Sequence, residues 1–172
     1  MTRASQALSG NKKNFYGGLD EGEQLKKAKG IALRLLALRP RSCKEVSGKL
    51  VQKGFLPSVI ENVVVYLIDY GYLNDQKFAQ ALAVHLLENK KFGFARIGAT
   101  LKERGLSPEL AKATISHLQQ NYSEEKTALQ IMKRRFSNFN ALRATPKDKN
   151  RIIQFLRRRG FSWETISDVL MI

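Results

Sequence analysis

Residues 45–64 read EVSGKLVQKGFLPSVIENVV, and this stretch decides the fold because the chain repeats its pattern twice. Residues 96–115 read RIGATLKERGLSPELAKATI, and residues 151–170 read RIIQFLRRRGFSWETISDVL. The three stretches align without gaps on Gly54, Gly105 and Gly160. Such internal similarity predicts one structural unit present in three diverged copies.

Apolar residues keep the same spacing around each glycine. One stands eight positions before the glycine and a leucine stands four positions before it, which places both on one face of a helix. Another follows the glycine directly, and a further one stands ten positions after it, so the pattern continues into a second helix. The aligned positions are Val46, Leu50, Phe55 and Val64, then Ile97, Leu101, Leu106 and Ile115, then Ile152, Leu156, Phe161 and Leu170.

The glycines mark the boundary between the two helices of each pair. We predict that the first helix ends there, because glycine adopts the left-handed conformation without steric cost and the apolar residue beyond it then folds back on the helix. The second helix is expected to begin at Pro57, at Ser107 with Pro108, and at Ser162. A serine oxygen caps free backbone donors at a helix start, and proline suits the first turn.

A further helical stretch precedes each pair, so each copy is expected to contain three helices. Ser42 and Glu45 have the spacing of a capping box at the start of the first pair, and Thr145 is the expected cap in the third copy. In the second copy, Asn74 or Asp75 can cap the opening helix. The three opening stretches are residues 25–38, 75–90 and 123–136.

The sequence therefore predicts an all-α protein made of three tandem three-helix repeats. Three short helices enclose only a small core, so neighbouring repeats should pack end to end in an elongated, curved array. Residues 63–68, VVVYLI, are rich in β-branched side chains but keep helical spacing, and we interpret them as buried helix. Residues 1–24 are polar and lack sustained periodicity, which is typical of a flexible arm. The expected repeats are residues 25–73, 74–121 and 122–172.

The charge balance gives the first indication of function. The chain has 30 Lys and Arg against 15 Asp and Glu, a formal charge of +15, and the excess belongs to the repeats because the arm is balanced. A surface of this kind attracts polyanions, so we expect nucleic acid or a nucleoprotein as partner. The sequence contains no apolar run long enough to span a bilayer and no secretory signal, and its single cysteine cannot form an internal disulfide. We expect a cytoplasmic monomer without a membrane partner.

Signals of catalysis are sparse. His85 and His117 lie in predicted helices without a cluster of metal-ligating side chains, and Cys43 has no nearby histidine. The sequence contains neither a phosphate-binding loop of the Walker type nor a dinucleotide fingerprint. We predict a protein that is not an enzyme and has no catalytic residues, cofactor or metal site.

Basic clusters near helix ends are the candidate binding residues. Cations at a helix C-terminus also complement the helix dipole by about 0.3–1 kcal/mol each, so part of this placement has a structural explanation. The collective excess is larger than helix ends require, and this favours contact with phosphate. The candidates for nucleic-acid or filament binding are Lys102, Arg104, Lys133, Arg134, Arg135, Arg151, Arg157, Arg158 and Arg159.

Over residues 25–172 the sequence resembles the RecX family of recombination regulators. The resemblance rests on three stretches in family order: residues 32–55, ALRLLALRPRSCKEVSGKLVQKGF; residues 66–83, YLIDYGYLNDQKFAQALA; and residues 91–107, KFGFARIGATLKERGLS. The most characteristic piece is GYLND, from Gly71 to Asp75, with Phe78 and Ala79 after it.

This resemblance implies a protein that binds the RecA filament on DNA, within the helical groove of the filament. It implies inhibition of strand exchange, ATP hydrolysis and coprotease activity, and hence regulation of recombination and of the SOS response. Single-stranded and double-stranded DNA are the nucleic-acid partners expected beside RecA. The family supplies no catalytic residues that could be transferred, and its contact residues cannot be placed from motif matches.

Two other functions fit the same residues. The pattern of helix, glycine and helix is similar to a helix-turn-helix, which would suit a transcription factor or nucleoid protein, although its threefold occurrence favours a scaffold over one recognition helix. A structural adaptor that binds only protein is the other alternative. Sequence-specific binding to a short duplex would favour the first, and salt-insensitive binding to protein alone would favour the second.

Overall fold

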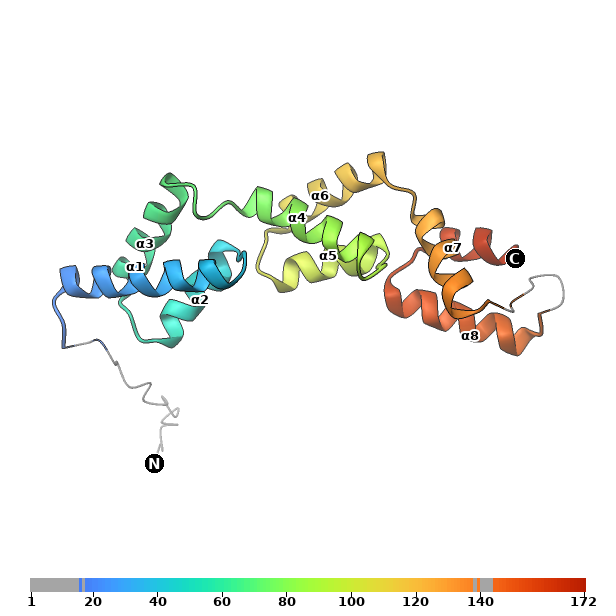
Figure 1. The fold of residues 1–172 in the computed structure, drawn as a ribbon, viewed down its shortest axis with the longest axis horizontal. Coiled ribbons are helices and arrows are strands. Elements are labelled where there is room, and N and C mark those ends of the chain that lie inside the picture. The colour runs from blue at the N-terminus through green and yellow to red at the C-terminus, as the bar shows by residue number, and fades with distance from the viewer. Residues whose placement is uncertain (1–15, 17, 138, 140–143) are drawn as a thin grey trace, which may run out of the picture. The chain divides into compact units, whose positions relative to one another are not determined.

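The fold is all-helical in the computed structural model, which describes residues 16, 18–137, 139 and 144–172. Over these residues the chain forms nine helices and no strand (Figure 1). The first three are α1 (Glu21–Leu38), α2 (Cys43–Gln52) and α3 (Pro57–Asp69). The middle three are α4 (Asp75–Glu88), α5 (Phe94–Glu103) and α6 (Pro108–Asn121). The last three are α7 (Glu124–Arg135), α8 (Pro146–Arg159) and α9 (Trp163–Leu170). The predicted fold of three tandem three-helix repeats is confirmed.

The predicted helix ends at the three glycines are confirmed by backbone geometry. Gly54, Gly105 and Gly160 have φ angles of 84°, 87° and 82°, in the left-handed region. In the first repeat, the amide of Phe55 donates to the carbonyl of Leu50 at 3.3 Å and that of Gly54 donates to Val51 at 3.0 Å. The second and third repeats have the same pair of bonds. This is the Schellman arrangement, which satisfies the last carbonyls of a helix and reverses the chain.

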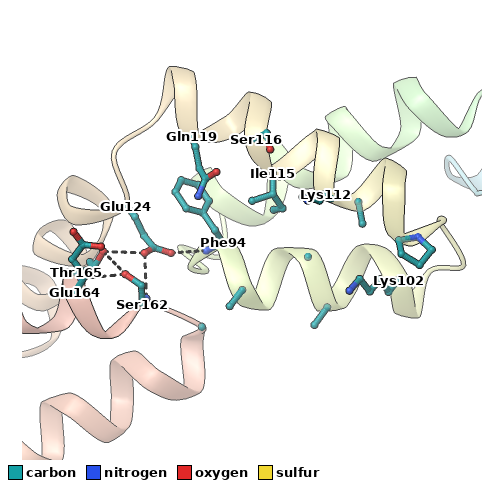
Figure 2. Close-up of a pocket in the computed structure, with 16 residues that line it drawn as sticks. Phe94, Lys102, Lys112, Ile115, Ser116, Gln119, Glu124, Ser162, Glu164 and Thr165 are labelled. Atoms are coloured by element: carbon teal, nitrogen blue, oxygen red, sulfur yellow. Dashed lines mark hydrogen bonds between the residues drawn. The ribbon is translucent and has the colours of Figure 1, made fainter.

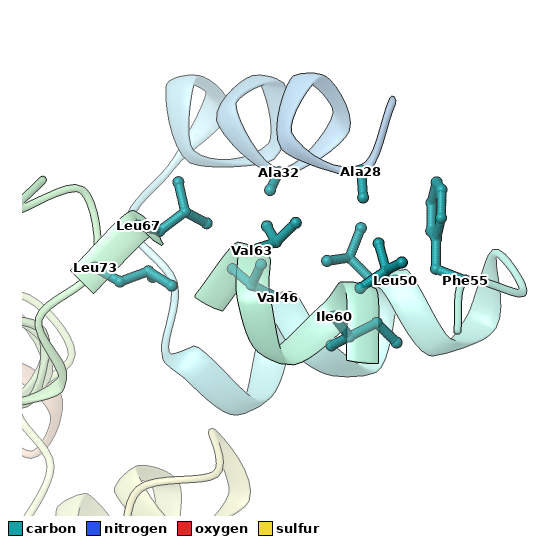
Figure 3. Close-up of a cluster of buried hydrophobic side chains, with 10 residues drawn as sticks. Ala28, Ala32, Val46, Leu50, Phe55, Ile60, Val63, Leu67 and Leu73 are labelled. Atoms are coloured by element: carbon teal, nitrogen blue, oxygen red, sulfur yellow. The ribbon is translucent and has the colours of Figure 1, made fainter. Parts of the chain in front are cut away.

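Each repeat has its own apolar core. Figure 3 shows the first, where Ala28 and Ala32 of α1 face Val63 and Leu67 of α3. The small alanines allow α1 to approach α3 closely, and all four side chains have no solvent exposure. The aligned residues of the second and third repeats occupy the corresponding cores, where Ile97, Leu101, Ile152 and Leu156 are buried.

The helix starts also follow the predicted caps. Ser42 and Glu45 form the expected capping box, and Asn74 is the residue that caps α4. Thr145 caps α8 and forms a second capping box with Asp148. Ser107 and Ser162 cap α6 and α9 through their side-chain oxygens.

Helix α1 begins at Glu21, inside the stretch that composition assigned to a flexible arm. The side chain of Asp20 accepts a hydrogen bond from the amide of Glu23 at 2.9 Å and caps the helix. Gln24 is only 2% exposed, and its side chain bonds the carbonyl of Leu19 and the amide of Leu56. A buried glutamine with two such partners fixes this turn, although hydropathy gives no sign of it. Residues 1–15 and 17, which make up most of the expected arm, lie outside the described residues.

The VVVYLI stretch is helical as predicted, but the prediction that it is buried was wrong for its outward side. Val63 and Leu67 are buried, whereas Val65 is 51% exposed and Ile68 is 47% exposed. Helix α3 packs against α1 and α2, and Val65 and Ile68 lie outside the core that these helices form.

The chain divides into two compact units, and each is described by itself. The first contains α1 to α3 and ends at Leu73, and the second runs from Asn74 to Ile172 and contains the second and third repeats together. Within the described residues, no helix is long and apolar enough to cross a membrane.

Candidate nucleic-acid interface

The second and third repeats are joined by a close backbone contact. The amide of Gly93, just before α5, donates to the carbonyl of Arg159 at 2.9 Å, and that of Ala95 donates to Gly160 at 3.3 Å. A side chain on Gly93 would collide with the carbonyl of Gly160, and one on Gly160 would collide with the backbone of Arg96. The end of α8 and the start of α5 are therefore held against each other.

One carboxylate strengthens this junction. Figure 2 shows Glu124, in the first turn of α7, extended toward the starts of two other helices. It accepts hydrogen bonds from the amide of Phe94 at 2.7 Å, from the amide of Ser162 at 3.2 Å and from the hydroxyl of Thr165 at 2.9 Å. Helix N-termini present free amides and a partial positive charge, so a carboxylate there is stabilised. Glu124 thus ties together the first turns of α5, α7 and α9.

A cationic pocket lies at the same junction. It has a volume of about 740 Å³ and lies between the turn after α4 and the helices α7 and α8. Five basic side chains line it and no acidic one does. The full lining, which defines the cationic pocket, is Asn89, Lys90, Lys91, Gln130, Ile131, Arg134, Arg135, Phe155 and Arg159.

Arg159 crosses from the third repeat to the second. Its guanidinium donates to the carbonyls of Lys90 and Lys91, and it lies 5.0 Å from the ring of Phe155 and 5.9 Å from that of Phe92. Burial lowers the pKa of Arg159, and repulsion from the nearby cation of Arg135 lowers that pKa further. The neighbouring charge that acts on Arg159 is thus another cation.

The remaining cations are arranged around Arg159. Arg135 lies 5.0 Å from the ring of Phe155, which Arg159 also contacts. Lys91 donates to the side chain of Gln130 at 3.1 Å. Lys91 has a φ angle of 54°, unusual outside glycine, which places it in a tight turn after α4. Lys90 and Arg134 are exposed at the pocket.

Such a cluster suits an anion with several oxygens. Arginine binds phosphate through paired N–H donors, and lysine adds a compact charge. Like charges gathered without an acid repel one another, and a bound anion would remove that repulsion. Most hydrogen bonds between proteins and nucleic acids go to backbone phosphates, and a pocket of this kind can supply them.

The cationic pocket contains some of the sequence candidates and leaves others outside. Arg134, Arg135 and Arg159 line it together, while Arg151 lies 5.9 Å from the ring of Phe136. The candidates that do not line it are Lys102, Arg104, Lys133, Arg151, Arg157 and Arg158.

Lys90 and Lys91 line the pocket but were not among the sequence candidates. They stand in the turn between α4 and α5, not at a helix end that matches the other repeats. The sequence feature that could have identified them is the pair of adjacent lysines just before Phe92 and Gly93. Nothing in the sequence showed that Arg159 reaches across to that turn.

A second hollow lies along α5, α6 and the start of α9 (Figure 2). It measures about 990 Å³, and its lining includes Lys102 and Lys112 together with Glu164. Its mixed charge makes it less suited to phosphate than the cationic pocket. Among the described residues, no group of three or more His, Cys, Asp or Glu could hold a metal ion.

Family models match the three repeats in order. The first three-helix domain of RecX matches residues 28–67, the second matches residues 74–115 and the third matches residues 123–170. Each match falls on one set of three helices in the structure.

Sequences and structures of known proteins agree with these models. The regulatory protein RecX of Trichlorobacter lovleyi is 33% identical over 78% of this chain and 88% of its own. The regulatory protein RecX of Bacillus subtilis is 33% identical over 85% of this chain and 54% of its own. The crystal structure of RecX from Lactobacillus salivarius has the same fold, with a TM-score of 0.74 and 20% identity over 87% of this chain and 96% of that one. On these grounds, the chain belongs to the RecX family of regulatory proteins.

Proposed function

We propose that this protein binds the RecA filament on DNA and inhibits strand exchange, ATP hydrolysis and coprotease activity. It would thereby restrain homologous recombination and the SOS response. Membership of the RecX family supports a regulatory role in recombination. Binding to RecA, inhibition of the activities of RecA and contact with DNA are proposed beyond that regulatory role.

The cationic pocket is the observation on which the DNA contact rests. Its five basic side chains converge from two repeats that are held together by Glu124 and by the contact of Gly93 with the end of α8. The fixed junction matters because the backbone positions that carry the cations need no ordering when they meet phosphate, and binding loses less conformational entropy. The proposed role of the pocket is to hold backbone phosphate of the nucleic acid in the filament.

Arg134, Arg135 and Arg159 are the sequence candidates that we retain for phosphate contact, together with Lys90 and Lys91. Arg159 also bonds two backbone carbonyls, so part of its role is structural. For the candidates outside the pocket, contact with RecA or DNA stays a proposal. They are Lys102, Arg104, Lys133, Arg151, Arg157 and Arg158.

ATP hydrolysis by RecA on single-stranded DNA tests the proposal. We expect added protein to lower the rate of hydrolysis at or below one molecule per RecA subunit. Coating of free DNA would require enough protein to cover the strand, so inhibition at lower amounts indicates action on the filament. Unchanged hydrolysis at saturating protein would refute the proposal.

The same assay separates the alternatives. Inhibition that begins only when protein covers the strand would indicate a DNA-binding protein that competes with RecA for DNA. Binding to one short duplex sequence with no effect on RecA would support a transcription factor. Salt-insensitive binding to RecA without DNA affinity would support an adaptor.

A further inference from the structure

Two tyrosines of the first unit form a pair that the core covers only in part. Tyr66 lies in α3 and Tyr70 directly follows the helix one turn later, with ring centroids 4.4 Å apart and an angle of 36° between the rings. The Nζ of Lys29, on α1, lies 3.7 Å from the centroid of Tyr66. Lys29, Tyr66 and Tyr70 are named here the tyrosine ladder.

The two tyrosines of the ladder differ in their exposure to solvent. Tyr66 is half-buried and packs against the core of the first repeat. Tyr70 is 67% exposed, although it lies against Tyr66. A large ring gains free energy when it is buried, so an exposed ring that is already held in place is suited to contact a partner.

The charge around the ladder favours a nucleic acid as that partner. Residues 25–73 contain nine Lys and Arg against three Asp and Glu. Lys26 is exposed one turn before Lys29 on the same side of α1, and Asp69 is the one acidic side chain next to Tyr70 along α3. A base placed against the ladder would therefore have Lys29, which lies over the ring of Tyr66, as a cation for its phosphate.

From these contacts we infer that the tyrosine ladder is a stacking platform for the bases of a single-stranded nucleic acid. Every base has a flat π-face, so stacking on tyrosine requires no particular sequence. A duplex hides those faces within its own stack, so the platform selects unpaired bases. The inference rests on the proposed function and adds a second contact of different chemistry, to bases through the first unit and to phosphate through the second.

Two strands of equal length provide the test. One is oligo-dT, and the other is an abasic strand that has the same phosphates and no bases. The affinity of the full chain for each is measured by fluorescence anisotropy over a range of salt concentrations. We expect the wild-type protein to bind oligo-dT more tightly than the abasic strand.

The variant Tyr70→Ala should lower the affinity for oligo-dT about 5-fold to 150-fold, the range expected for one lost base stack. Its affinity for the abasic strand and the salt dependence of its binding should not change, because no phosphate contact is lost. Tyr70→Phe keeps the ring and should bind oligo-dT as the wild type does. Ile68→Ala is the matched control, since Ile68 is an exposed apolar residue on the same helix outside the ladder.

Equal binding of the wild-type protein to both strands would refute the platform and leave the proposed function intact. So would loss of oligo-dT affinity in Ile68→Ala equal to that in Tyr70→Ala. If Tyr70→Ala binds oligo-dT normally but inhibits RecA less, the ladder contacts protein and the inference is wrong. A wild-type protein that binds neither strand and does not inhibit RecA refutes both proposals. Thermal unfolding by circular dichroism verifies that each variant is folded.

Discussion

At Gly160, conformation and space exclude a side chain for different reasons. Its φ of 82° is left-handed, which costs other residues about 1–2 kcal/mol. A Cβ there would also collide with the backbone of Arg96 in the second repeat. The same glycine that ends α8 therefore sets how closely the third repeat approaches the second.

We predict that Gly160→Ala lowers the free energy of unfolding of the second unit by about 2 kcal/mol or more, because strain and collision act together. Trp163, the one tryptophan of the chain, lies in α9 and reports this unfolding by its fluorescence in a denaturant titration. Gly98→Ala is the control within the same unit, since Gly98 lies within α5 and a Cβ there meets the side chain of Ile115 at 3.6 Å, an ordinary contact distance. That variant should gain about 0.5–1 kcal/mol from helix propensity. Equal stability of Gly160→Ala and the wild type would show that the contact between α8 and the start of α5 rearranges without loss of stability.

Arg159 shows how a residue can serve a fold and a binding site together. Its guanidinium donates to the carbonyls that follow α4 and lies 5.0 Å from the ring of Phe155 and 5.9 Å from that of Phe92. These contacts hold its charge beside Arg135 in the cationic pocket. Removal of Arg159 alone would therefore disturb the junction and the pocket together, so variants of the exposed cations are more informative.

At the scale of helices, the second unit is organised by the meeting of three helix starts on Glu124. The carboxylate accepts bonds from α5 and α9 while it occupies the first turn of α7. Hydrogen bonds to a charged acceptor contribute about 1.5–3 kcal/mol, more than neutral ones. Glu124 thus couples the second repeat to the third through the amide of Phe94, beside the bonds of Arg159 to Lys90 and Lys91.

We expect Glu124→Gln to lower the free energy of unfolding of the second unit by about 1–2 kcal/mol, since the amide keeps part of the bonding and loses the charge. Amide hydrogen exchange at Phe94 and Ser162 should become faster, because these two donors lose a strong acceptor. Glu125→Gln is the matched control: Glu125 is exposed in the same turn and should change stability by less than about 0.5 kcal/mol. Unchanged exchange at both amides in Glu124→Gln would mean that the backbone contact alone holds the repeats together.

The helix pairs could be predicted from sequence, whereas the junction between repeats could not. The spacing of Leu50, Gly54 and Phe55 is a local code, because the bonds that end α2 join residues within one turn. Glu124 looks like an ordinary acid in a first turn, yet it bonds backbone amides 30 and 38 residues away. Arg159 and Lys90 are brought together from positions 69 residues apart. Such contacts depend on the packing of whole repeats, which residue spacing does not encode.

At the scale of the whole molecule, the excess cations are arranged in two ways. Some cations are scattered on exposed helix faces, as Arg157 and Arg158 are at the end of α8. Others converge in the cationic pocket, where Lys90 and Arg134 are exposed and line a hollow of about 740 Å³. A formal charge of +15 attracts DNA in either arrangement, but only convergent cations can contact the same short run of phosphates.

Two double variants of equal net charge distinguish binding by the convergent cations of the pocket from binding by the scattered cations. Lys90→Gln with Arg134→Gln removes two cations of the pocket, and Arg157→Gln with Arg158→Gln removes two exposed cations outside it. Each phosphate contact on single-stranded DNA adds about −0.7 to the slope of log K against log salt, so loss of both pocket contacts should make the slope less negative by about 1.4. The outer pair should change the slope by less than half of this amount. Equal changes for the two pairs, measured by anisotropy on oligo-dT, would mean that the surface binds DNA by its total charge and that the pocket is not a distinct site.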